Sequence, residues 1–209
     1  MNLLEYLIIF VLIYLSIYFL VALHELGHYY FAKKCGFQIL AVKIGLIPIF
    51  NKGIFSFGLL PFVGDTTIDM TDELFEDKNQ ALKFALRKAG GIIFQIILLI
   101  PCLIIEHYTK WFPLILFNTL NTILLLLNAM PLQYSNGSIT DGRGFLISLS
   151  DQLKHKPVFT RETYAELLDE LEAEDLGITV EELRELRLQQ IENQPHKPTQ
   201  QELEAFFSD

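Results

Sequence analysis

The sequence predicts a membrane α-helical protein: a three-span bundle with a β-hairpin and a cytoplasmic tail that is helical or partly disordered. Three observations support this fold class. Apolar runs of about membrane-spanning length occur three times before residue 150. A β-rich stretch broken by glycines and prolines lies between the first two runs, and the chain from residue 151 onward is strongly acidic.

The apolar runs define three expected spans. The first covers residues 3–23, and at a rise of ~1.5 Å per residue a helix of this length crosses a ~30 Å hydrocarbon core. The second is expected at about residues 89–105, where Arg87 and Lys88 can extend their charged ends to the interface. The third is expected at about residues 113–130.

The distribution of lysine and arginine predicts the orientation in the membrane. Residues 24–88 hold 8 of these basic side chains, the short turn 106–112 holds 1, and the residues after the third span hold 7. Since basic residues concentrate on the cytoplasmic side, we expect the N-terminus outside and the C-terminus in the cytoplasm. Three spans without a targeting signal suit a bacterial plasma membrane.

The C-terminal region differs sharply in charge from the rest. Residues 151–209 carry 15 acidic and 6 basic side chains, so they account for the whole formal net charge of -9. This balance argues against binding of nucleic acid, which needs a basic face. We therefore expect a membrane domain at residues 1–150 and an acidic cytoplasmic tail at 151–209, where Thr179 and Glu182 predict a capping box. The tail is a candidate docking region for a cytoplasmic partner.

The hairpin is expected at about residues 39–64. Two β-rich runs flank the turn signal "NKG". Open backbone at membrane depth is tolerated only where protein or water covers it, so an exposed edge could accept an extended peptide by strand addition. A simple amphiphilic cap on the bundle is the alternative interpretation.

The motif "HELGH" at the end of the first apolar run carries the chemistry. His24 and His28 lie four residues apart, on one face of a helix that we expect to continue through Lys34, and so they can hold one metal ion. Glu25 lies ~100° around the helix, which suits a general base that activates water beside the metal. Zinc is the natural occupant, and ionisable residues at membrane depth mark function.

A metal with two histidine ligands needs a third protein ligand. The best candidate is Asp141 of the pair Asp141-Gly142 beyond the third span, although such a pair is also typical of a plain turn. Glu73 and Glu76 in the first cytoplasmic loop would instead serve a membrane zinc protease of another clan. Spacing alone leaves both choices open.

Four stretches occur in an order that resembles a known family: "HELGH", "IGLIPIFNKGIFSFGLLPFVGD", "AGGIIFQ" and "NAMP…DG". Residues 1 to about 146 are similar to the site-2 protease family of intramembrane zinc metalloproteases, as a minimal member without a peptide-recognition domain. The resemblance implies zinc bound by His24, His28 and Asp141, with Glu25 activating water. It also implies that the hairpin dips into the membrane.

The sequence departs from the family pattern at two points. "LQYSNGSIT" separates Pro131 from Asp141, so the third ligand is expected from a loop and not directly from the span. Gln95 takes the place of the family's asparagine, and Gln95 and Asn128 are candidates for contact with substrate or a developing oxyanion. Alternatively, Gln95 makes an interhelical amide contact with Asn118 or Asn121.

These features predict an intramembrane zinc metalloprotease that hydrolyses transmembrane or membrane-associated peptides near the cytoplasmic face. Its expected partners are such protein substrates and the lipid bilayer. A non-catalytic zinc-binding membrane scaffold and a zinc protease with a glutamate third ligand are the alternatives.

Overall fold

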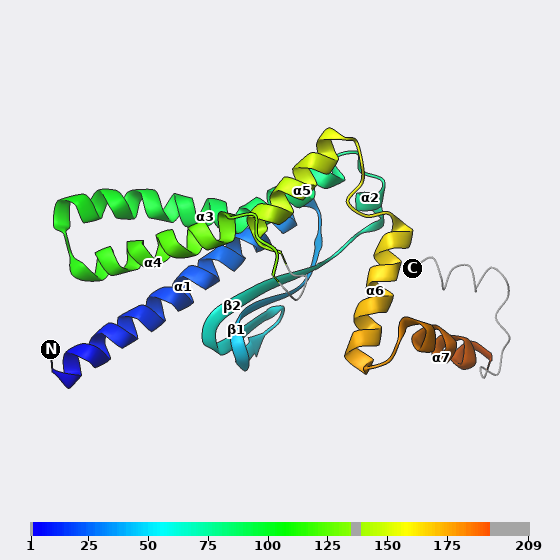
Figure 1. Cartoon of the computed structure of the whole chain (residues 1–209), viewed down its shortest axis with the longest axis horizontal. Helices are drawn as coiled ribbons and strands as arrows, with labels where there is room; N and C mark the ends of the chain where they lie inside the picture. Colours follow the sequence, from blue (N-terminus) through cyan, green and yellow to red (C-terminus); the bar gives the residue numbers. More distant parts are fainter. Residues whose placement is uncertain (1, 135–138, 193–209) are drawn as a thin grey trace. The chain divides into compact units, whose positions relative to one another are not determined.

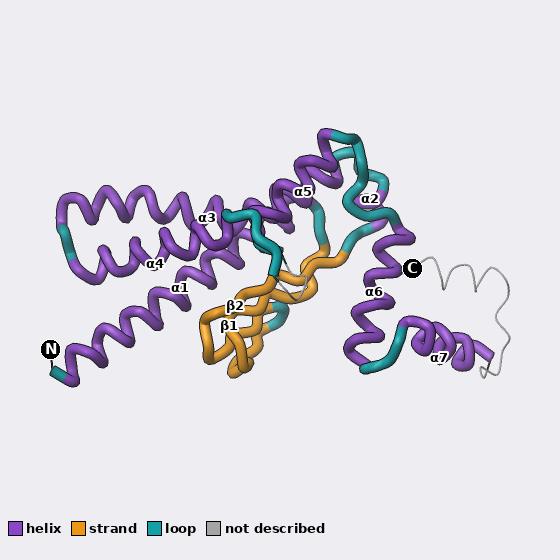
Figure 2. The backbone as a smooth tube through the Cα atoms, in the orientation of Figure 1, coloured by secondary structure: helices purple, strands orange, loops and turns teal. Residues whose placement is uncertain are grey.

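The computed structural model describes residues 2–134 and 139–192 of the chain, which are mostly helical with one small antiparallel sheet (Figure 2). They separate into two compact units between Val158 and Phe159, beyond the expected boundary at residue 150. One reason is that the backbone N–H of Val158 donates to Gln80 Oε1 at 2.7 Å, which ties this segment to the first unit.

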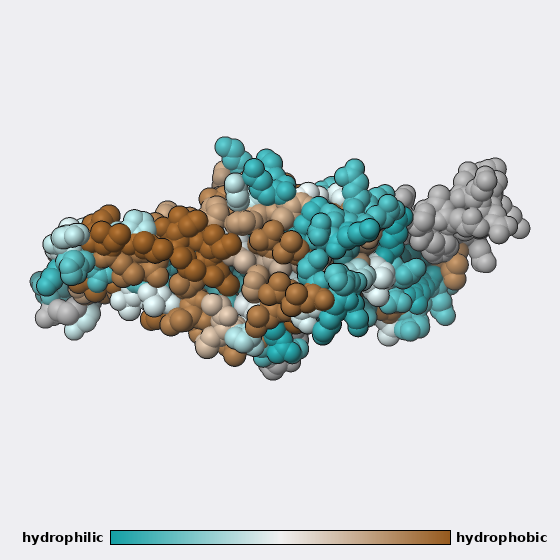
Figure 3. Space-filling model, turned by 90° about the horizontal axis from the view of Figure 1, so that it is seen from above, coloured by the Kyte–Doolittle hydropathy of each residue, from teal (hydrophilic) through white to brown (hydrophobic). Residues whose placement is uncertain are grey.

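Three helices of the first unit are long and apolar enough to cross a membrane. They are α1 (Leu3–Cys35), α3 (Gln80–Thr109) and α4 (Phe112–Ala129), and they contain the three expected spans. α3 and α4 run side by side as a helical hairpin, and α1 packs against both (Figure 1). Hydrophobic side chains gather on the surface over these helices, as a lipid environment requires (Figure 3).

α1 is continuous over 33 residues, which confirms that the helix of the first span extends through the "HELGH" motif and beyond Lys34. It packs closely against α3 through glycines. A Cβ added to Gly27 would lie 2.6 Å from the carbonyl carbon of Gly90, so neither position has room for a side chain. Because of this close approach, the face of α1 that carries His24 and His28 packs directly on α3.

The sheet consists of β1 (Gln38–Lys52) and β2 (Phe55–Asp69), which pair antiparallel around a turn at Gly53, the expected hairpin. Residues 42–44 have partners on both sides, because 55–57 lie along one edge and 64–66 along the other. β2 continues beyond the expected end at residue 64, and this extension reaches the motif of α1.

A one-turn helix, α2 (Asp72–Phe75), leads from the sheet towards α3. After α4 the chain forms an isolated bridge between Gln133 and Ile139, and then α5 (Asp141–Leu153) begins. α5 packs against α3 and contacts α4, so the end of the first unit returns to the same region as the motif.

The second unit contains α6 (Arg161–Leu176) and α7 (Val180–Glu192), in agreement with the short helices expected of the tail. The predicted capping box is confirmed: the backbone N–H of Thr179 donates to Glu182 Oε2 at 2.7 Å, and that of Glu182 to Thr179 Oγ1 at 3.2 Å. Residues 193–209 of the expected tail lie outside the described residues.

Candidate metal centre

The motif places three ionisable side chains at the buried end of α1. His24, Glu25 and His28 are 7%, 5% and 6% exposed, and one ligand atom from each lies within 4.8 Å of the others. The Nε2 atoms of His24 and His28 are 3.0 Å apart, because residues four apart share a helix face. α1 therefore presents two imidazole nitrogens to one point.

Asp141 reaches the same point from the other end of the unit. Its Oδ2 lies 2.8 Å from His24 Nε2 and 2.9 Å from His28 Nε2. The expectation that this aspartate comes from a loop is wrong: Asp141 is the first residue of α5, and the side chain of Thr140 caps that helix. A cap residue directly before a first helical turn fixes the direction in which the helix starts.

The start of α5 is held against the end of α4. Leu132 N–H donates to Thr140 Oγ1 at 3.1 Å, and Thr140 Oγ1 donates to the carbonyl of Met130. A Cβ added to Gly142 would lie 2.5 Å from the carbonyl carbon of Ala129. The glycine of the Asp141-Gly142 pair thus allows the close approach of the two helices that delivers the aspartate.

The second ring nitrogen of each histidine also has a partner. His28 Nδ1 lies 2.7 Å from the carbonyl oxygen of Arg87, and His24 Nδ1 lies 3.0 Å from Gln95 Oε1. Since these oxygens can only accept, each Nδ1 carries the proton and each Nε2 keeps its lone pair. Partners of this kind hold the imidazoles in the tautomer and orientation that a metal ligand needs.

Three electron-pair donors consequently meet at one point: two imidazole Nε2 atoms and Asp141 Oδ2. Such a group suits a cation between its members, and two neutral imidazoles with one carboxylate are a donor set suited to zinc. The Lys88 ammonium, whose Nζ lies 3.4 Å from Asp141 Oδ1, favours the ionised form of this carboxyl. The carboxylate stays ionised, as a ligand must be.

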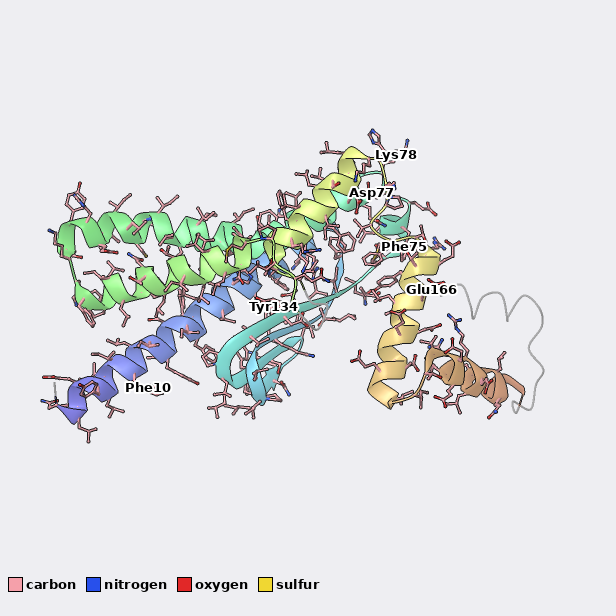
Figure 4. All side chains as sticks on the ribbon, viewed as in Figure 1. Phe10, Phe75, Asp77, Lys78, Tyr134 and Glu166 are labelled. Atoms are coloured by element: carbon pink, nitrogen blue, oxygen red, sulfur yellow. The ribbon has the colours of Figure 1, made fainter. Side chains whose placement is uncertain are left out.

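A cavity of about 590 Å³ opens beside these groups. Glu25 lines it and accepts a hydrogen bond from Thr66 Oγ1 at 2.7 Å. Figure 4 labels Tyr134, which also lines the cavity, on the segment between α4 and α5. The lining residues are Val21, His24, Glu25, His28, Val63, Gly64, Asp65, Thr66, Arg87, Lys88, Gln95, Leu124, Asn128, Tyr134, Ile139, Thr140 and Asp141.

The comparison with protein families covers the part of the chain that holds the two histidines. The model of peptidase family M50, the site-2 protease family, matches residues 12–112. Over these residues the chain resembles peptidase family M50. The match includes the "HELGH" motif and α3 and ends before Asp141. No curated protein matches the chain.

The match to family M50 implies an intramembrane metalloprotease that acts on peptide substrates, and the His24–Glu25–His28 cluster fits zinc binding. The three long apolar helices together with the family indicate an integral membrane protein.

The side chain of Gln95 has a different neighbour from the ones considered from the sequence. Its Oε1 faces His24, while Asn121 Nδ2 donates to the backbone oxygen of Gln95 at 3.3 Å. Asn118 donates to another residue, Glu106. Gln95 thus supports a histidine of the motif, with its amide oxygen already engaged.

The other polar candidates are divided between the cavity and the surface. Asn128 lines the cavity, and its Nδ2 lies 3.4 Å from His24 Nδ1. Glu73 and Glu76, considered as third ligands, are exposed and are not among the cavity residues. Sequence reasoning did not single out Thr66 or Arg87 in the site, because both reach it through contacts between distant parts of the chain.

The contact between α1 and α3 gives a first prediction. A Cβ added to Gly91 would lie 2.5 Å from His24 Nδ1, so Gly91→Ala should push the imidazole aside. We expect a loss of about 1–3 kcal/mol in the free energy of unfolding, as for other overpacked sites, and a lower zinc content. Thermal unfolding in detergent and metal analysis measure both.

Gly144→Ala is the matched control on a second helix. Its added Cβ would meet the flexible Lys88 side chain at 3.1 Å, which can move, and alanine favours the helix by roughly 1 kcal/mol. Gly144→Ala should therefore be as stable as the wild type or more so. Equal stability of the two variants would contradict the proposed crowding at His24.

Proposed function

We propose that the protein is a zinc metalloendopeptidase that cleaves transmembrane or membrane-associated peptides near the cytoplasmic face. One observation carries the proposal: His24 Nε2, His28 Nε2 and Asp141 Oδ2 lie within 3.0 Å of one another beside a cavity. A second carboxylate, Glu25, lines the same cavity. Family M50 supports the same chemistry.

Zinc would be held by His24, His28 and Asp141. Asp141 is favoured over Glu25 as the third ligand because one of its oxygens contacts both Nε2 atoms, whereas Glu25 Oε2 is engaged by Thr66. When bound at such a site, zinc lowers the pKa of water to ~7 and polarises a carbonyl group.

Glu25 would act as the general base. Its carboxylate would take a proton from a water molecule in the cavity and return it to the leaving amine of the cleaved peptide. Asn128 offers an amide N–H in the cavity wall and remains our candidate for stabilising the developing oxyanion. Gln95 would instead orient His24 through the contact with its Nδ1.

The substrate would bind as an extended strand. Residues 63–66 of β2 line the cavity, and residues 64–66 pair with β1 on one edge; among the described residues no strand pairs with the other edge. A peptide bond in a helix is shielded by its own backbone, so an unwound segment that pairs with this edge would present its carbonyl to the metal centre.

The location of the site follows from the basic residues. Eight of the lysines and arginines lie in residues 24–88, which supports a cytoplasmic position for the inner end of α1 and a membrane such as a bacterial plasma membrane. Water would then enter from the cytoplasm. The acidic unit of α6 and α7 would lie on the same side, available to a cytoplasmic partner.

The test uses the full chain purified in detergent. Zinc content is measured first, and cleavage is then followed on single-span reporter peptides that carry a quenched fluorophore pair around the cytoplasmic third of the span. We expect about one zinc per chain and cleavage within that third. Zinc binding without cleavage of any reporter would instead indicate the non-catalytic scaffold.

A further inference from the structure

We propose that Thr66 of β2 is a positioning residue for Glu25, and that Arg87 holds Thr66 in place. The sheet would then fix the direction of the general base in addition to any contact with substrate. This inference rests on the proposed function, because it assigns to Thr66 a part in the reaction for which Glu25 is the base.

The contact between the two side chains is short and buried. Thr66 Oγ1 lies 2.7 Å from Glu25 Oε2 and 3.4 Å from the backbone oxygen of Glu25, and Thr66 and Glu25 are 3% and 5% exposed. A hydroxyl has one proton to donate, and the shorter distance assigns it to the carboxylate. Hydrogen bonds to an ionised acceptor are stronger than those between neutral groups.

The strand also controls the space around the carboxylate. A Cβ added to Gly64 would lie 2.5 Å from Glu25 Oε1, so the glutamate packs directly on the backbone of β2. Oε2 is engaged by Thr66, and this leaves Oε1 as the oxygen that can take a proton from water. A glutamate without this contact would sample several rotamers, of which few present an oxygen at the reacting position.

Thr66 is itself fixed from two directions. It pairs with Val42 in the sheet, and the guanidinium of Arg87 donates to its carbonyl oxygen at 2.6 Å. The carbonyl of Arg87 in turn accepts the hydrogen bond from His28 Nδ1 at 2.7 Å. These contacts link Glu25 to Thr66, Thr66 to Arg87, and Arg87 to His28. Since His28 and Glu25 lie one turn apart on α1, the contacts close into a ring.

Through this ring of contacts Thr66 can orient Glu25, although Thr66 is not itself a proposed metal ligand. Arg87 makes two of these contacts. Its backbone carbonyl orients His28, a proposed metal ligand, and its side chain holds Thr66, which positions the base. The distance between the metal centre and the base is therefore held by contacts from three elements: α1, β2 and α3.

The test compares Thr66→Val, which keeps the shape and loses the hydroxyl, with Thr66→Ser, which keeps the hydroxyl. Thr67→Val is the matched control, because Thr67 is the next residue of β2 and its hydroxyl donates to Asp65. For Thr66→Val we expect kcat on the reporter peptide to fall about 10- to 100-fold, as for a misplaced catalytic group, with KM and zinc content close to wild type. Thr66→Ser and Thr67→Val should behave like the wild type.

A binding measurement gives a readout that does not depend on turnover. A peptide hydroxamate chelates zinc, and its hydroxyl group bonds to the general base, so its Kd reports the position of Glu25. In zinc-loaded protein Thr66→Val should weaken hydroxamate binding about 10-fold, while Thr66→Ser and Thr67→Val should not change it. If Thr66→Val does not fold, Arg87→Met takes its place and should weaken hydroxamate binding several-fold.

The outcomes separate this inference from the proposed function. The inference is overturned if Thr66→Val, or the Arg87→Met variant that replaces it, has the same kcat and hydroxamate affinity as Thr67→Val. It is also overturned if Thr66→Ser loses as much kcat and hydroxamate affinity as Thr66→Val. If the wild type binds zinc and hydroxamate but cleaves no reporter, the proposed function fails. A weaker hydroxamate Kd for Thr66→Val would still support the positioning of Glu25 in that case.

Discussion

Replacing Glu25 with glutamine should leave zinc bound and lower peptide hydrolysis by about 10²- to 10⁴-fold, the range typical of a lost general base. Glutamine has the same shape and can still accept the hydrogen bond from Thr66, but its amide cannot take a proton from water. The two imidazoles and Asp141 are unchanged in this variant. Initial rates on the reporter peptide and metal analysis of the same preparation measure the two quantities.

Glu5→Gln is the control for this experiment. Glu5 lies at the opposite end of α1 in a capping box with Asn2, and glutamine preserves that contact. The control should keep full activity and zinc. Retained turnover in Glu25→Gln would exclude this glutamate as the base and leave the reaction to another group in the cavity.

Replacing Asp141 with asparagine should release the metal. The change removes the negative ligand atom that lies 2.8 and 2.9 Å from the two Nε2 atoms, and the amide that replaces it is a weaker ligand. Loss of an outer partner already costs 10- to 100-fold in metal affinity, so we expect a drop of at least about 100-fold for a direct ligand. Competition with a chromophoric zinc chelator gives the affinity, and hydrolysis should be lost in parallel.

Asp151→Asn is the matched control, because Asp151 lies on the same helix and is not among the cavity residues. It should bind zinc like the wild type. Full zinc occupancy in Asp141→Asn would instead favour a glutamate as third ligand, the arrangement of a zinc protease of another clan. In that case Glu25 would be the first glutamate to replace by mutation, since it lies in the same cluster as the two histidines.

The parts of this protein that were predictable from the sequence are those that depend on local pattern. Long apolar runs determine the spans, and the spacing of His24 and His28 determines a shared helix face whatever the rest of the fold does. The turn around Gly53 and the capping box at Thr179 depend equally on neighbouring residues. Each of these predictions agrees with the structure.

Contacts between distant residues were harder to predict. Asp141 was the best candidate for the third ligand, but spacing left the choice open and the family resemblance strengthened it, because 113 residues separate Asp141 from His28. The inserted stretch before it suggested a loop, although Thr140 before the Asp141-Gly142 pair is a recognisable N-cap. In the structure the cap at Thr140 starts a helix at Asp141, even though a long inserted stretch precedes it.

The roles of Gln95 and Thr66 show the same limit. Gln95 was considered for an oxyanion or for an asparagine on α4, and its contact with His24 joins residues 71 apart in sequence. Thr66 and Glu25 are 41 apart and belong to a strand and a helix. No periodicity or spacing reports such a pair, because its distance is set by how the sheet docks on α1.

The continuity of α1 has a consequence for how bilayer thickness would influence the proposed reaction. Because the helix runs without a break from Leu3 to Cys35, His24 lies roughly 30 Å along it from its N-terminal end, at ~1.5 Å per residue. A thinner or thicker bilayer must therefore tilt the whole helix, and with it the reaction centre, instead of bending a joint between anchor and site. Lipid chain length should shift which bond of a spanning substrate comes level with the metal.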